Sequence, residues 1–150
     1  MTDKDIEELK KRLDKLEAIE EIRTLRAKYG HLVHESRIDE LMALFSEKAS
    51  GDYPYGEFEN KAAFREFFTK MRPRPVNMSH NAVIEVHGDR ASAEWYYTGS
   101  FASKTMATTL VGKYEEEYIK EDGVWKFLKI KANQILGPVV KVERQAPGGS

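Results

Sequence analysis

Hydrophobic residues in the first third of the chain recur every three or four positions, which is the spacing of one helix face. The longest such run spans residues 6–32, and Thr2 or Asp3 can cap the helix that it predicts. Gly30 lies inside the run and predicts a kink or the start of a second helix, because glycine costs about 1 kcal/mol in a helix. The first apolar residues resemble a coiled-coil seam, but too few heptads follow. We therefore expect this helix to pack across a sheet.

Two shorter helices are predicted after the long one. The segment 38–45 has inward-facing apolar residues, with Ser36 as its cap. Residues 51–56 are rich in turn formers, and helical spacing then restarts over 60–68 behind an Asn60 cap. Pro73 and Pro75 end this last helix.

From Met78 onward the apolar period changes to two, which predicts strands over 81–86, 91–101, 109–119 and 124–135. Turn formers separate them at 87–90 and 120–123, as in an antiparallel meander. The same alternation places Glu116 on the face of Tyr114. Helices followed by antiparallel strands indicate an α+β fold, in which a curved sheet under the helices encloses a pocket lined by aromatic residues.

Composition narrows the class of protein. The length of 150 residues fits one globular domain with its own core. A net charge of −1 lacks the basic excess of a nucleic-acid-binding domain, so we expect no nucleic-acid partner. No stretch approaches the roughly 20 apolar residues that cross a bilayer, so we expect no membrane contact and a cytoplasmic location. The chain has no cysteine, which excludes disulfides and thiolate chemistry.

Several short sequence words occur in an order that resembles the SnoaL-like branch of the nuclear-transport-factor-2-like superfamily. They are Leu16–Arg23, Tyr29, Asp39–Leu41 with Leu44-Phe45, Met78–Asn81, Ala93–Tyr96, Gly112–Tyr118 and Asp122–Phe127. The resemblance implies a cone-shaped curved antiparallel sheet packed against N-terminal helices and enclosing a pocket. It implies one such domain over residues 1–142, followed by a flexible tail over 143–150.

Within that branch the chain is similar to cofactor-free lyases: bile-acid 7α-dehydratase, scytalone dehydratase and hexachlorocyclohexane dehydrochlorinase. The resemblance assigns His80 as the catalytic base and Tyr29 as the donor to a substrate oxygen. The carboxylate that orients the base in those enzymes is replaced here by His34. An imidazole can fix the tautomer of His80 but supplies no negative charge, so His80 would be a weaker base. The residues expected to bind substrate are Tyr55, Trp95, Tyr97, Phe101 and Tyr114.

The predicted function is that of a cofactor-independent, dehydratase-like lyase acting on a hydrophobic small molecule with a carbonyl group. The alternatives are a non-catalytic small-molecule-binding domain and a polyketide cyclase or isomerase of the same fold. No cofactor and no metal are expected, although His31, His34 and His80 together offer a metal site as a less favoured reading. The resemblance also implies a homo-oligomer, a dimer or a trimer. An enclosed pocket in which His34 or a carboxylate reaches His80 would favour the enzyme over the binding domain.

Overall fold

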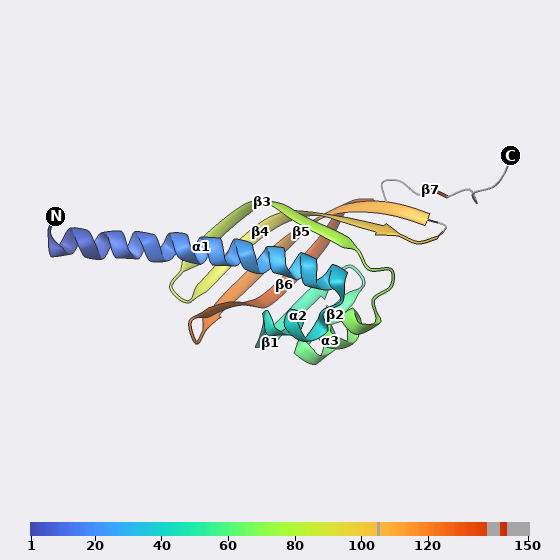
Figure 1. Cartoon of the computed structure of the whole chain (residues 1–150), viewed down its shortest axis with the longest axis horizontal. Helices are drawn as coiled ribbons and strands as arrows, with labels where there is room; N and C mark the ends of the chain where they lie inside the picture. Colours follow the sequence, from blue (N-terminus) through green and yellow to red (C-terminus); the bar gives the residue numbers. More distant parts are fainter. Residues whose placement is uncertain (105, 138–141, 144–150) are drawn as a thin grey trace.

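Three helices lie against one face of a mixed β-sheet in the computed structural model, which describes residues 1–104, 106–137 and 142–143 (Figure 1). The predicted α+β class is confirmed. The elements are α1 (Asp3–Glu35), α2 (Ile38–Ala43), β1 (Phe45–Tyr53), β2 (Gly56–Phe58), α3 (Lys61–Lys70), β3 (Val76–His87), β4 (Arg90–Ala102), β5 (Met106–Glu121), β6 (Val124–Leu136) and β7 (Val142–Glu143). The predicted tail, residues 143–150, lies outside the described residues apart from Glu143. Among the described helices, none is both long and apolar enough to cross a membrane.

Helix α1 begins at a capping box. The backbone N–H of Asp5 donates to the Thr2 hydroxyl at 3.2 Å, and the Thr2 N–H donates to the Asp5 carboxylate at 2.9 Å. The helix continues without interruption to a left-handed Ser36, which therefore caps its end and not the start of α2. The alternative that a second helix starts near Gly30 is wrong, because α1 is continuous through this residue. A Cβ there would lie 2.7 Å from the carbonyl oxygen of Asn77, so the glycine lets α1 approach β3 closely.

The two halves of α1 have different surroundings. Residues 3–17 are all exposed and project beyond the sheet (Figure 1). From Ala18 onward one face of the helix is buried, chiefly through Ile22, Leu25 and Tyr29, against the sheet. The prediction that the helix packs across a sheet therefore holds only for its second half.

The strand order in the sheet is β2-β1-β6-β5-β4-β3, with β7 paired to β5. Strands β3 to β6 form the predicted antiparallel meander, and Gly88 and Gly123 take positive φ angles in its turns. Strand β1 was not predicted, and it pairs parallel to β6. The sheet is therefore mixed, not purely antiparallel as expected, and β1 extends it toward α2 and α3.

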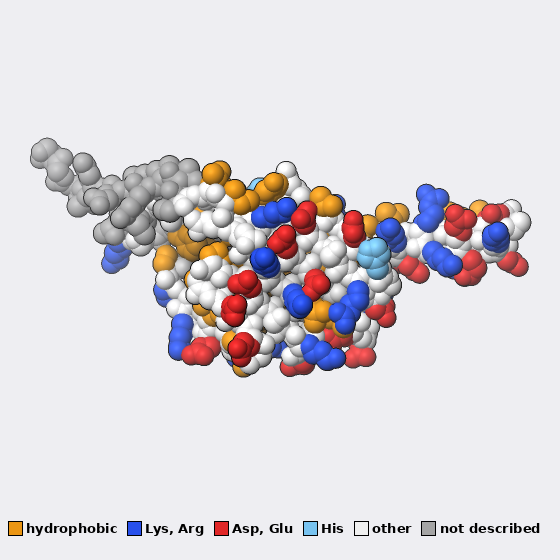
Figure 2. Space-filling model, turned by 180° about the vertical axis from the view of Figure 1, so that it is seen from behind, with side chains coloured by type: hydrophobic (Ala, Val, Ile, Leu, Met, Phe, Trp, Pro, Cys, Tyr) orange, Lys and Arg blue, Asp and Glu red, His pale blue; other side chains and the backbone are white. Residues whose placement is uncertain are grey.

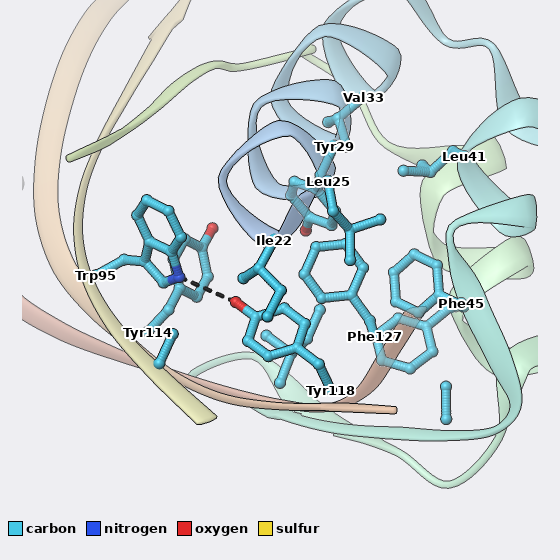
Figure 3. Packing of buried hydrophobic residues seen from close by; sticks show 14 of the residues in the cluster. Ile22, Leu25, Tyr29, Val33, Leu41, Phe45, Trp95, Tyr114, Tyr118 and Phe127 are labelled. Carbon is cyan, nitrogen blue, oxygen red and sulfur yellow. Dashed lines mark hydrogen bonds between the residues drawn. The ribbon is translucent and has the colours of Figure 1, made fainter. Parts of the chain in front are cut away.

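The core between the helices and the sheet consists largely of aromatic rings (Figure 3). Phe45 from β1 packs on Phe127 from β6 with ring centroids 5.3 Å apart, and on Phe64 from α3 at 4.8 Å. Helix α3 starts at the predicted cap, where the Asn60 side chain accepts a hydrogen bond from the Ala63 N–H at 2.9 Å. These contacts hold α3 and β1 beside the end of α1, where a cavity forms.

Candidate functional site

A cavity of about 740 Å³ lies where α1, α3, β1 and the inner face of β3 to β6 meet. This volume is in the range of pockets that enclose a small organic molecule. The lining is mainly aromatic and aliphatic, with a few polar groups. The lining includes Tyr29, Val33, Tyr53, Tyr55, Glu57, Glu66, Phe67, Phe68, Asn77, Tyr97, Gly99, Phe101, Leu110 and Tyr114.

Five tyrosines contribute hydroxyl groups to the cavity. The other polar side chains in the lining are Glu57, Glu66, Lys70, Arg72, Asn77 and Gln134. The hydroxyls of Tyr29 on α1 and Tyr53 on β1 are hydrogen-bonded to each other at 3.2 Å. The Asn77 side-chain amide on β3 donates to the Tyr114 hydroxyl at 2.9 Å. Burial raises the pKa of Tyr97 to about 12, and it also raises the pKa values of Tyr29, Tyr53 and Tyr114. All four hydroxyls are therefore neutral near pH 7. The hydrogen bond between Tyr29 and Tyr53 uses one of their two protons, so this pair can donate one hydrogen bond to a ligand oxygen, and Tyr97 and Tyr114 can each donate another.

Stacked rings form two walls of the cavity. Tyr55 stacks on Phe67 at a centroid distance of 4.8 Å and on Tyr53 at 5.3 Å. The Tyr55 ring is 59% exposed, which places it at the rim. On the sheet side Tyr97 stacks on Tyr114 at 4.2 Å. Such flat aromatic surfaces favour ligands that contain rings.

Behind the tyrosines lies a buried ion pair. The Arg26 Nε of α1 is 3.4 Å from the Glu116 Oε1 of β5, and neither side chain is exposed. The Arg26 guanidinium carbon lies 3.6 Å from the Tyr114 ring centroid and 4.2 Å from that of Tyr29. Burial raises the pKa of Glu116, and the Arg26 charge opposes this rise. The cavity wall formed by Tyr29 and Tyr114 is thus backed by a cation.

Glu116 belongs to a short chain of hydrogen bonds inside the core. Tyr118 donates its hydroxyl proton to Glu116, and the Trp95 indole N–H donates to the Tyr118 oxygen at 3.0 Å (Figure 3). Two guanidinium nitrogen atoms of Arg26, Nη1 and Nη2, have no hydrogen-bond partner among the described residues. The prediction that Glu116 lies on the same face of the strand as Tyr114 is confirmed. The sequence did not show whether this carboxylate is buried, and the structure shows that it is.

The structure does not bring His80 into the cavity. Its ring is exposed on the outer face of the sheet, where Nε2 lies 3.2 Å from the Thr98 hydroxyl. Strand β3 has a register shift between His80 and Val83, and Asn81 within it has a φ of 56°. Such a bulge adds one residue and reverses which positions face inward. Asn77, not His80, therefore faces the cavity.

The other predicted site residues divide into two groups. Tyr29, Tyr55, Tyr97, Phe101 and Tyr114 line the cavity. Their roles toward a substrate stay predictions.

His34 and Trp95 do not line it. His34 lies in a smaller groove between α1 and β3, together with His31, and its Nδ1 is 3.1 Å from the Pro75 carbonyl oxygen. Trp95 is buried in the core and lines the same groove. Within the described ranges, no three His, Asp or Glu side chains lie close enough together to hold a metal ion.

Sequence reasoning missed three residues that shape the site: Arg26, Tyr53 and Asn77. Arg26 follows Ile22 by four positions, so it lies on the buried face of α1, and this spacing was the available signal. Tyr53 is in the segment that was interpreted as turns. Asn77 lies outside the predicted strand 81–86, and only the bulge reveals its direction.

Comparisons with known proteins agree with this fold. No curated protein matches the chain in sequence. Among solved structures, a proposed scytalone dehydratase from Novosphingobium aromaticivorans has a TM-score of 0.74 and 18% identity, covering 87% of this chain and 90% of its own. The hexachlorocyclohexane dehydrochlorinase LinA, type 2, has a TM-score of 0.74 and 18% identity, with 93% and 99% covered. An NTF2-like protein with a cystatin-like fold, also from N. aromaticivorans, has a TM-score of 0.74 and 19% identity, with 86% and 89% covered.

These identities show a shared fold and not a shared reaction. The model of the SnoaL-like domain matches residues 14–131, which is more than half of the chain. This match includes the buried half of α1, strands β3 to β5 and the first part of β6. The chain belongs to the family of SnoaL-like domains.

Proposed function

We propose that the cavity binds a hydrophobic, ring-containing small molecule whose carbonyl or phenolic oxygen accepts hydrogen bonds from the tyrosine hydroxyls. The observation that carries this proposal is the pair of neutral hydroxyls of Tyr29 and Tyr53 at the inner end of an aromatic-walled cavity. The Arg26 cation behind Tyr29 supports it, because a positive charge favours partial negative charge on a bound oxygen.

Two matched ring compounds test the binding proposal. 1-Tetralone has a carbonyl oxygen, and tetralin has the same ring system without it. Tetralone should bind more tightly, because each hydrogen bond contributes about 1 kcal/mol, or roughly fivefold in affinity. Tyr29→Phe should remove most of this preference while tetralin binding changes little. Isothermal titration calorimetry or ligand-observed NMR measures both affinities.

Tyr96→Phe is the matched control, because Tyr96 precedes Tyr97 in β4 but is 42% exposed on the outer face. It should bind both compounds as the wild type does. Equal affinity of the wild type for tetralone and tetralin, or an equal loss in both tyrosine variants, would contradict the proposed hydrogen bonds.

The second candidate function is a lyase reaction in the same cavity. It is favoured by the structural similarity to a proposed scytalone dehydratase and to LinA. Tyr29 would hydrogen-bond the carbonyl or the departing oxygen. The described lining holds no imidazole, so its carboxylates, Glu57 and Glu66, are the candidate bases. The hydrogen bond from Lys70 lowers the pKa of Glu66, which makes Glu66 the weaker base.

The lyase function is tested by incubating the protein with a panel of cyclic hydroxy-ketones and measuring the absorbance of the enone product. Tyr29→Phe should lower kcat about 100-fold or more if the hydroxyl acts as a general acid. His80→Ala should leave kcat unchanged, since His80 lies outside the cavity. A large loss in His80→Ala would instead support the base that the family resemblance assigned.

A further inference from the structure

The projecting half of α1 carries an unpartnered apolar stripe, formed by Ile6, Leu9, Leu13 and Leu16. These side chains are 39%, 46%, 54% and 64% exposed, respectively. Their spacings of three, four and three residues are those of the a and d positions of a coiled coil over two heptads. Two heptads are too few to indicate a coiled coil from the sequence, but the structure adds that all four side chains are exposed. Figure 2 shows this part of the helix standing clear of the folded body, surrounded by charged side chains. Among the residues that the structure describes, this half is held only by its continuity with the packed half of α1, so a partner along the stripe would stabilise it.

The stripe points away from the side of α1 that packs on the sheet. Leu9, Leu13 and Leu16 each precede a buried residue of the same helix by nine positions: Ala18, Ile22 and Leu25. Nine residues correspond to about two and a half helical turns, so each pair lies on opposite sides of the axis. A second helix can therefore pair with the stripe without meeting the body of this chain.

We propose that this stripe pairs with the same stripe of a second copy of the chain, in a parallel two-stranded coiled coil. The two folded bodies then lie on the outer sides of the helix pair. Ile6 and Leu13 occupy a positions, and Leu9 and Leu16 occupy d positions. In parallel coiled coils, isoleucine at a with leucine at d favours two strands, and the heptad of Ile6 and Leu9 has this pattern.

The flanking charges select this partner and this orientation. In the parallel arrangement each g residue faces the e residue five positions later on the other copy. Asp5 then faces Lys10, and Arg12 faces Glu17, so both kinds of pair have opposite charges. In the antiparallel arrangement that aligns the two stripes, Arg12 of one copy faces Arg12 of the other, and Lys10 faces Lys10 in the same way. Like charges oppose that alternative.

Sedimentation velocity over a range of protein concentrations tests the pairing with the full chain. The wild type should dimerise, and Leu13→Glu should raise the dimer Kd at least about 100-fold. Leu13→Ala, which keeps a good helix former at this position, should raise it at least about tenfold. Lys11→Gln changes the charge by the same amount as Leu13→Glu but on the opposite side of the helix, and it should leave the Kd within about threefold.

A charge exchange tests the orientation. Arg12→Glu alone places two carboxylates together in the parallel pair and should weaken it, and adding Glu17→Arg should restore it. Because the chain has no cysteine, oxidised Leu9→Cys should give one disulfide-linked dimer in the parallel pair. A wild type that stays monomeric at millimolar concentration, or a dimer that Leu13→Glu leaves intact, would overturn the proposal. Failure of the charge exchange to restore pairing would overturn the parallel orientation.

Discussion

Glu116→Ala is expected to lower the free energy of unfolding by about 3–5 kcal/mol, because it leaves the Arg26 charge buried without its partner. Neither side chain of the pair is exposed, so water cannot replace the lost carboxylate. The loss also removes the acceptor of the Tyr118 hydroxyl. Urea denaturation followed by circular dichroism measures the change.

Glu117→Ala is the matched control for this prediction. Glu117 is the next residue of the same strand and has an exposed ion pair with Lys129 at 3.5 Å, so its loss should cost at most about 1 kcal/mol. The double variant Arg26→Met with Glu116→Leu should regain most of the stability, since apolar side chains of similar size can replace a buried ion pair. A cost below about 1 kcal/mol for Glu116→Ala alone would show that the pair is not sealed from water.

Gly112→Ala is expected to damage the cavity and to cost about 1–3 kcal/mol of stability. A Cβ at this position would lie 2.2 Å from the Tyr97 ring carbon Cζ, so the ring must leave its stack on Tyr114. The wall of the cavity would change shape, and 1-tetralone affinity should fall at least about fivefold. Denaturation and calorimetry measure the two effects on the same sample.

Gly99→Ala provides the comparison, because Gly99 also lines the cavity and lies in the neighbouring strand β4. A Cβ there has its nearest contact at 3.5 Å, with a Leu110 side-chain carbon, which is ordinary packing. We expect its stability to stay within about 0.5 kcal/mol of the wild type. Similar losses of stability in Gly99→Ala and Gly112→Ala would contradict the steric clash with the Tyr97 ring as the cause of the effect at position 112.

The sequence predicts the meander well and strand β1 poorly, for a physical reason. In β4 the buried and exposed positions alternate from Ala91 to Tyr97, and this regular pleat is visible as a period of two. In β1 both Phe45 and Ser46 are buried, and its register with β6 shifts between Phe45 and Ser50. An irregular strand leaves no clean period, so its partner decides its conformation.

The candidate site shows the same limit at the level of single residues. Ala82 and Ile84 pack toward the core, and a period of two extended backwards from them places His80 inward. The bulge at Asn81 breaks this parity and turns Asn77 to the cavity. The aromatic lining needed no such detail, because Tyr97 and Tyr114 lie in regular stretches of strand. The alternation of apolar residues thus predicts the aromatic lining of the cavity more readily than it predicts which polar side chain faces the cavity.

The parallel pairing of β1 with β6 has a consequence for the order in which the molecule assembles. Strands β3 to β6 join neighbours in the chain, whereas β1 must find a partner from near the other end of the sheet-forming sequence. Closing so long a loop costs chain entropy before any contact repays it, which favours late docking of β1. Tyr53 arrives with that strand, so the ligand cavity is completed only when the two distant parts of the polypeptide have met.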